Sequence, residues 1–134
     1  MTQKTYPDNF SEYEFGCKCG CGYNDIHYDT LDFLDKLRKA IGQPISIVSG
    51  CRCESHNKNV GGAPNSKHCE GKAVDIICQP TSPRVLLLHC MALYPDCIQG
   101  IGISLGSSII HLAVQEIPHL FYRQQVRHPY IFIQ

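Results

Sequence analysis

The chain has little of the composition that marks proteins acting on nucleic acids or within membranes. Its 134 residues carry no net charge, because 12 basic side chains balance 12 acidic ones, so no footprint for nucleic acid or polybasic membrane anchor is indicated. No apolar run reaches the roughly 20 residues that a membrane-spanning helix needs. The N-terminus lacks the pattern of a signal peptide, so we expect synthesis in the cytoplasm.

The hydrophobic content of 43% is sufficient for the core of a single domain over residues 1–134, with residues 1–14 as a surface arm. Apolar periodicity and turn residues predict helices at residues 30–41, 54–60 and 83–94, and strands at 44–48, 72–78, 100–105 and 109–114. Residues 130–133 are a candidate edge strand. Because helices and strands do not alternate strictly, we predict an α+β domain with an antiparallel sheet and helices packed against one face.

The first predicted helix has the clearest boundaries. Its leucines recur at helical spacing, Asp29 is a candidate N-cap, and Gly42 is placed to end the helix. Ser82 and Pro83 have the residue types preferred at the N-cap and first position of the last helix.

A histidine and an aspartate stand seven residues apart, at His68 and Asp75. Imidazole nitrogen and carboxylate oxygen both bind divalent metals such as zinc. Asp75 lies within the predicted strand at residues 72–78, and His68 lies in the loop before it. Gly71 between them allows that loop to bend so that both side chains reach one point. This spacing predicts half of a metal site.

A catalytic zinc usually takes three protein ligands and keeps a fourth position for water. The best candidate for the third ligand is His111, which lies inside the apolar run of residues 108–114. We therefore predict that His68, Asp75 and His111 bind one Zn²⁺.

The pattern S-x-H-x-x-G-x-A-x-D, formed by Ser66, His68, Gly71, Ala73 and Asp75, resembles the zinc D-Ala-D-Ala carboxypeptidase family. That family includes peptidoglycan peptidases, phage endolysins and the structurally related hedgehog signalling domain. Residues 49–53 (SGCRC), 56–66 (HNKNVGGAPNS) and 100–103 (GIGI) are similar to further elements of the family in the same order. The resemblance implies a zinc-dependent peptidase that cleaves peptidoglycan stem peptides, as a D,D-carboxypeptidase or an endopeptidase, and that acts at the cell wall if it belongs to a lysis system.

The resemblance also implies a substrate site. Arg52 would bind a carboxylate of the substrate, which suits the planar guanidinium group. Ser66 would orient the loop or donate a hydrogen bond to the substrate. His56 and Asn57 are interpreted as structural residues of the short helix.

One departure from the family pattern concerns the general base. Family peptidases usually place an acid three residues before the last zinc histidine, and here that position is Ser108. A serine does not accept a proton at neutral pH, and general-base assistance is worth about 10²–10⁴-fold. Glu70 and Glu116 are the candidate substitutes. The alternative function is a non-catalytic zinc module of the same fold that binds cell wall or a partner.

The nine cysteines are many for a chain of this length, and an odd count leaves at least one unpaired in any monomeric disulfide scheme. Cys17, Cys19, Cys21, Cys51 and Cys53 could form disulfides, bind a second, structural zinc, or remain reduced thiols. A further alternative is a cysteine-based redox or structural metal protein, but the spacing matches no clean zinc-finger pattern.

Overall fold

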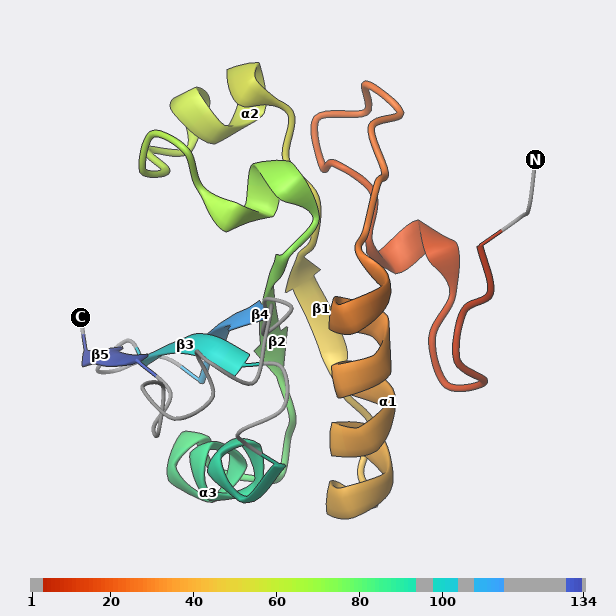
Figure 1. Cartoon of the computed structure of the whole chain (residues 1–134), viewed down its shortest axis with the longest axis vertical. Helices are drawn as coiled ribbons and strands as arrows, with labels where there is room; N and C mark the ends of the chain where they lie inside the picture. The colour runs from red at the N-terminus through yellow and green to blue at the C-terminus, as the bar shows by residue number, and fades with distance from the viewer. Residues whose placement is uncertain (1–3, 94–97, 104–107, 115–129, 134) are drawn as a thin grey trace, which may run out of the picture.

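The structure is a computed structural model that describes residues 4–93, 98–103, 108–114 and 130–133. Three helices and five strands account for most of the described chain, together with two single 3₁₀ turns (Figure 1). In chain order the elements are η1 (Glu12–Glu14), α1 (Tyr28–Ile41), β1 (Ser46–Ser49), α2 (Glu54–Asn59), η2 (Lys67–Glu70), β2 (Ala73–Ile77), α3 (Pro83–Leu93), β3 (Ile98–Ile103), β4 (Ile110–Val114) and β5 (Tyr130–Ile133). The predicted α+β class is confirmed.

The five strands form one sheet in the order β1-β2-β4-β3-β5. The pairs β1–β2, β2–β4 and β3–β4 are antiparallel, as predicted. The pair β3–β5 is parallel, so the predicted antiparallel sheet gains one parallel strand at this edge. A parallel partner needs a long connection, and residues 115–129 between β4 and β5 are long enough to allow it. The predicted hairpin turn at Gly106 and Ser107 lies outside the described residues.

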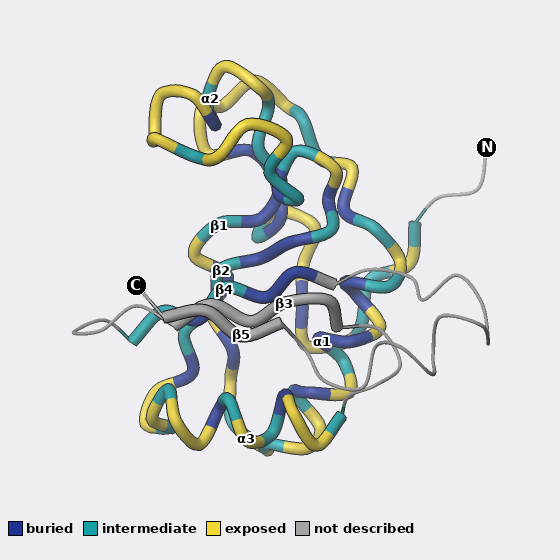
Figure 2. The backbone as a smooth tube through the Cα atoms, turned by 60° about the vertical axis from the view of Figure 1, so that its left-hand side comes forward, coloured by how far each residue is buried: buried dark blue, intermediate teal, exposed yellow. Residues whose placement is uncertain are grey.

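Alternation along the strands gives the sheet two chemically different faces. Ile47, Val74, Ile76, Ile110 and Leu112 are buried and point into one hydrophobic cluster with residues of α1 and α3. Figure 2 shows the resulting buried band along β1, β2 and β4. Asp75 and His111 occupy the intervening positions, so their side chains leave the sheet on the face away from this core. Burial of the aliphatic rows thereby fixes which face carries the polar residues.

The amphipathic helix α1 buries one side against the sheet through Leu31, Phe33, Leu34 and Leu37. Its C-terminus is capped by Gly42 in the left-handed conformation (φ 70°), as predicted. Its N-cap is His27 and not Asp29. The imidazole Nδ1 of His27 accepts a hydrogen bond from the Asp29 backbone N–H at 3.1 Å, which leaves Asp29 in the first turn.

Residues 4–14 pack against the domain, which differs from the predicted surface arm. Phe10 is buried, and the ring of Tyr6 stacks on Phe15 at 5.7 Å between centroids. These aromatic side chains attach the segment to the core. The polar and charged residues around them explain why the sequence predicts a surface arm.

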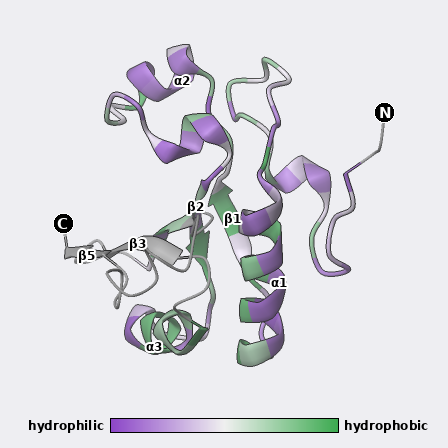
Figure 3. Ribbon diagram, viewed as in Figure 1, coloured by the Kyte–Doolittle hydropathy of each residue, from purple (hydrophilic) through white to green (hydrophobic). Residues whose placement is uncertain are grey.

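Hydropathy divides the molecule along its length (Figure 3). The helices α1 and α3 carry apolar residues towards the sheet, whereas α2 consists entirely of polar residues. None of the helices in the described ranges combines the length and apolar character that crossing a bilayer requires. The polar end formed by α2 and η2 is where the candidate site lies.

Candidate metal centre

Strand register brings three polar residues into one row across β1, β2 and β4. Asp75 pairs with His111 on one side and with Ser49 on the other. Directly opposed residues project to the same face of a sheet. The pairing of β1 shifts by one residue between Ile47 and Ser49, and such a bulge re-aims the following side chain. Ser49 therefore lies on the Asp75 side although Ile47 points into the core.

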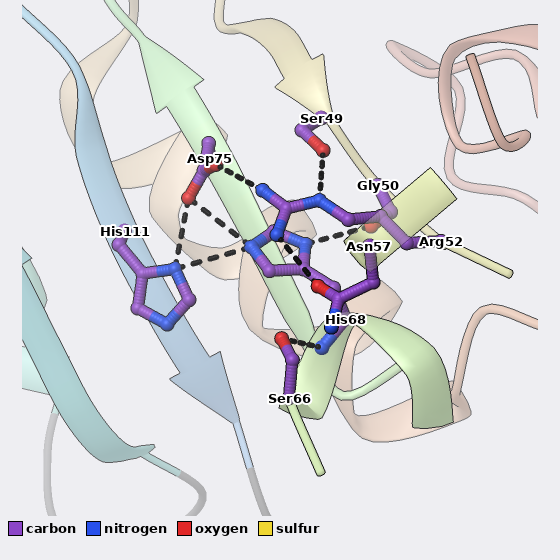
Figure 4. A network of polar contacts seen from close by, with 8 residues as sticks. All are labelled: Ser49, Gly50, Arg52, Asn57, Ser66, His68, Asp75 and His111. Carbon is purple, nitrogen blue, oxygen red and sulfur yellow. Dashed lines mark hydrogen bonds and ion pairs between the residues drawn. The ribbon is translucent and has the colours of Figure 1, made fainter. Parts of the chain in front are cut away.

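Three donor atoms converge on this face (Figure 4). The Asp75 Oδ1 atom lies 2.8 Å from His111 Nδ1 and 3.3 Å from His68 Nε2. The two histidine nitrogens lie 3.2 Å apart. Asp75 and His111 come from strands, whereas His68 comes from η2. The three residues predicted as metal ligands are therefore brought together.

Contacts on its far side fix the orientation of the His68 ring. Its Nδ1 atom lies 2.7 Å from the carbonyl oxygen of Gly50, which can only accept, so Nδ1 carries the hydrogen. Metal binding requires the neutral imidazole, in which Nε2 directs its lone pair towards Asp75 and His111. Without a metal, a protonated Nε2 donates to Asp75 instead. The backbone N–H of His68 donates to Ser66 Oγ at 3.2 Å, and Gly71 caps η2 with φ 71°. The predicted bend at Gly71 is confirmed.

The Asp75 carboxylate is held in its ionised form. Burial acts to raise its pKa, but the hydrogen bonds and charges of His111 and His68 outweigh burial and hold the pKa well below its ordinary value. Its second oxygen, Oδ2, accepts a hydrogen bond from Arg52 Nη2 at 3.2 Å. The site therefore contains a negatively charged carboxylate whose two oxygens are both held by neighbouring side chains.

Arg52 bridges the row of strand residues to α2. Its Nε donates to Ser49 Oγ at 3.2 Å, and its Nη1 donates to Asn57 Oδ1 at 3.1 Å. Asn57 is buried and in turn donates to the carbonyl oxygen of Ala63 at 3.0 Å. Together with the contact from Nη2 to Asp75, these contacts use three of the five guanidinium N–H groups. The arginine is thus a positioning residue for Asp75 in this structure.

The three donors fit a tetrahedral zinc ion. At zinc–nitrogen and zinc–oxygen distances near 2.0–2.2 Å, ligand atoms of a tetrahedral site lie about 3.3–3.6 Å apart. The observed separations of 2.8–3.3 Å form a slightly tighter triangle of the same shape. Two unprotonated nitrogens beside a carboxylate oxygen repel one another unless a cation or proton lies between them. A divalent cation satisfies all three at once.

The candidate bases and substrate residues are placed less uniformly. The Glu70 carboxylate is exposed and pairs with Lys67 at 3.2 Å within η2. Ser108 is half-buried and precedes β4. Glu116 lies outside the described residues. Ser66 caps η2 through its hydroxyl oxygen, so its contact in this structure is structural.

Two hollows adjoin the centre. One of about 340 Å³ is lined by Arg52 together with Tyr23, Cys53, Glu54 and Cys69. A larger one of about 730 Å³ runs along α2 and contains Ser66 and Glu70 on its wall. Neither is lined by the three donors themselves, so the hollow that contains Arg52 is the nearer approach for a ligand.

Sequence reasoning missed two contributors. In the sequence, Ser49 and Gly50 stand out only as part of the run that is similar to the family, yet Ser49 holds Arg52 and the Gly50 carbonyl orients His68. Their position at the end of a predicted strand, directly before Arg52, is the signal that could have identified them.

A family model described as peptidase M15 matches residues 8–113, a range that contains all three donors. The chain belongs to the peptidase M15 family. The family resemblance drawn from the motifs is thereby confirmed. Over 48 residues the chain is 44% identical to the zinc D-Ala-D-Ala carboxypeptidase of Streptomyces albus G. This match covers 35% of the present chain and 19% of that relative, so it spans about a fifth of the curated protein's length.

Proposed function

We propose that this M15 family member is a zinc-dependent peptidase that hydrolyses peptide bonds in peptidoglycan stem peptides. The observation that carries the proposal is the convergence of His68 Nε2, Asp75 Oδ1 and His111 Nδ1 within 3.3 Å of one another. The name of the Streptomyces relative supports both the metal and the substrate class. Three protein ligands are the usual number in catalytic zinc sites, where one position stays open.

Two of the three ligands, His68 and Asp75, have a supporting contact that holds them for this role. When bound, zinc would polarise the scissile carbonyl and lower the pKa of a coordinated water. The Gly50 carbonyl keeps the lone pair of His68 Nε2 directed at the centre. Arg52 holds the oxygen of Asp75 that does not face the histidines. The residues thus form an organised site that needs only a small outward shift of the ligand atoms to hold zinc.

The substrate side of the proposal involves Arg52 and Ser66. Arg52 keeps two N–H groups beyond its contacts with Ser49, Asn57 and Asp75, and it lines the hollow next to the centre. A carboxylate of the stem peptide can accept from these groups. The Ser66 oxygen accepts from His68, and its own hydroxyl proton can still be donated to the substrate.

The general base is the weakest part of the catalytic machinery. Glu70, Glu116 and Ser108 are the candidates on the sequence, and Glu70 is drawn towards Lys67. The serine in place of an acid favours a second candidate function, a zinc module that binds the cell wall or a partner without hydrolysis. If the chain is a peptidase, a stem-peptide substrate implies that it acts at the cell wall, as an endolysin-type enzyme does.

The test is hydrolysis of defined stem peptides by the purified protein at known zinc occupancy. We expect release of a terminal D-alanine, or of a cross-bridged fragment, from muropeptides ending in D-Ala-D-Ala, detected by mass spectrometry. His68→Ala should abolish turnover because it removes a buried metal donor. His89→Ala on α3 is the matched control and should retain it, since α3 packs against the core face of the sheet and the three metal ligands lie on the other face.

Chelation followed by zinc addition distinguishes the two candidates. Loss and recovery of hydrolysis supports the peptidase. Zinc-dependent binding of the same muropeptides without any cleavage product would favour the non-catalytic module. An active chain that keeps full rate in His68→Ala would contradict both.

A further inference from the structure

Four cysteine side chains gather at the polar end of the molecule, apart from the His–Asp–His centre. Cys17, Cys19 and Cys21 come from the loop between η1 and α1, and Cys53 precedes α2. Their sulfur atoms all lie within 4.8 Å of one another. Figure 1 shows the loop and α2 rising at the same end of the sheet. Cys51, grouped with Cys53 in the sequence, is instead buried in the core and contacts Asn24.

We propose that these four cysteines bind a second zinc ion as a closed, structural site. The Sγ atom of Cys17 lies 3.4 Å from that of Cys19 and 3.8 Å from that of Cys53, and the Cys19–Cys53 separation is 3.7 Å. A tetrahedral zinc with zinc–sulfur distances near 2.3 Å places its sulfurs about 3.8 Å apart. Disulfide sulfurs lie about 2.05 Å apart. The spacing matches a shared ion and not a covalent pair.

Backbone N–H groups point at the sulfurs, as a thiolate site requires. The N–H of Cys53 donates to Cys17 Sγ, that of His56 donates to Cys53 Sγ, and that of Tyr23 donates to Cys21 Sγ, each at 3.4 Å. Hydrogen bonds to a charged ligand stabilise its charged form and fix its direction. Three of the four sulfurs therefore have a polar neighbour that supports the anion.

The loop conformation explains how cysteines with a single residue between them can share one ion. Gly20, between Cys19 and Cys21, and Gly22, directly after Cys21, have φ of 83° and 87°, a left-handed conformation that bends the loop. The Cys17 N–H donates to the Tyr23 carbonyl at 2.8 Å and closes the loop. In an extended strand these cysteines would lie on one face but about 6.8 Å apart, too far for their sulfurs to share one ion, and the folded loop avoids that spacing.

The second ion would tie two distant parts of the chain together next to the first site. Cys53 follows Arg52 directly and caps α2 through its sulfur, and α2 carries Asn57, the acceptor for Arg52. Four thiolates fill a tetrahedral coordination shell and leave no position for a substrate. Its role is therefore to hold the segment that orients Arg52, and not to perform chemistry.

Zinc content per chain tests this proposal independently of peptidase activity. The full-length protein is purified with a reductant and its bound metal is counted by native mass spectrometry and elemental analysis. We expect Cys19→Ser and Cys21→Ser to hold one zinc fewer than the unmodified chain. Both residues are exposed, so serine removes no core contact. Cys69→Ser, a cysteine outside the cluster, is the matched control and should keep the full count.

Cobalt substitution separates this site from the proposed catalytic one. The intense ultraviolet bands of cobalt–thiolate bonds should persist in His68→Ala and weaken or shift in Cys19→Ser. If only the His68 variant lost metal, the cysteine site would be refuted and the proposed function would stand. A denatured mass lower by two hydrogens for each disulfide, an unchanged zinc count in both serine variants, or iron in place of zinc would each overturn the proposal.

Discussion

The two ligand clusters of this chain are built in opposite ways. The His–Asp–His centre combines strand residues with a buried histidine, and hydrogen bonds to Gly50 and Arg52 hold its ligands from behind. The cysteine cluster lies on a loop and a helix cap, and two of its members are exposed. The sheet can organise the first cluster before any ion arrives, whereas loops need an ion to hold them together. An organised, open site suits catalysis, and a closed site made of loops suits a structural role.

The largest expected effect concerns the general base, which the His–Asp–His centre lacks at the position of Ser108. If the centre is limited by the absence of a base, Ser108→Glu should raise kcat on stem peptides by up to roughly 10²–10⁴-fold, because the carboxylate can accept a proton from the attacking water. Kinetics at equal zinc occupancy measure the effect. Ser108→Gln, with the same length and no basic oxygen, is the control and should give no gain.

Two further variants locate a base that has moved. Glu70→Gln and Glu116→Gln are assayed beside the unmodified chain. If the unmodified chain is already fast and one of these changes abolishes turnover, the role assigned to Ser108 is wrong.

The second effect tests the close backbone contact between Gly50 and Phe15, which lies between the two ligand clusters. A Cβ atom at Gly50 would lie 2.6 Å from the Phe15 carbonyl oxygen, which also accepts from the Cys51 N–H at 2.8 Å. Phe15 lies two residues before Cys17 of the cysteine cluster, and Gly50 lies two residues before Arg52. Gly50→Ala should therefore lower the free energy of unfolding by about 1–3 kcal/mol, the usual cost of overpacking.

Denaturant titration measures this loss at saturating zinc. Gly16→Ala is the matched control, because a Cβ there meets no atom within 4 Å. Equal stability of the two alanine variants would show that this backbone contact is not tightly packed.

The smallest effect concerns the residue between the clusters. Arg52→Lys removes the fork that bridges Ser49, Asn57 and Asp75, since an ammonium group cannot reproduce the planar set of donors. Loss of a group that orients a metal ligand typically costs about 10–100-fold in metal affinity or activity. Competition with a zinc chelator and binding of muropeptides give the two constants. The exposed Arg84→Lys on α3 should change neither.

The zinc affinity and the muropeptide affinity of Arg52→Lys, taken together, also assign the function of Arg52. Weaker muropeptide binding at full zinc occupancy indicates direct contact with substrate. Weaker zinc binding alone indicates that Arg52 acts only through Asp75. If both constants stay unchanged, the bridge seen in the structure does not matter to either process.

Much of the fold was predictable because its core rows are strictly periodic. The alternation around Asp75 placed β2, and the leucine spacing of α1 with its terminal Gly42 placed that helix. The N-cap was misassigned to Asp29 because histidine is not among the preferred capping residues, although its ring nitrogen serves here. The parallel pairing of β5 could not be read from its sequence, since a short apolar run fits either direction.

The site was predictable in its ligands and not in their supports. His68 and Asp75 are marked by residue type and spacing, and His111 by its position in an apolar strand. Arg52 was predicted to face a substrate, yet three of its N–H groups face the protein, because contacts between distant segments depend on packing that spacing does not encode. The cysteine set differs from the sequence grouping for the same reason, with Cys51 turned into the core.

Ser49, Asp75 and His111 form one row across three strands, so metal binding depends on the correct register of those strands. If β4 paired with β2 one residue out of place, His111 would enter the core and Leu112 would take its position beside Asp75. A chain misaligned in this way would lose a metal ligand and bury an imidazole together. Metal uptake therefore selects the correctly aligned sheet, and insertions during evolution should be found in the connecting segments and excluded from the interiors of β2 and β4.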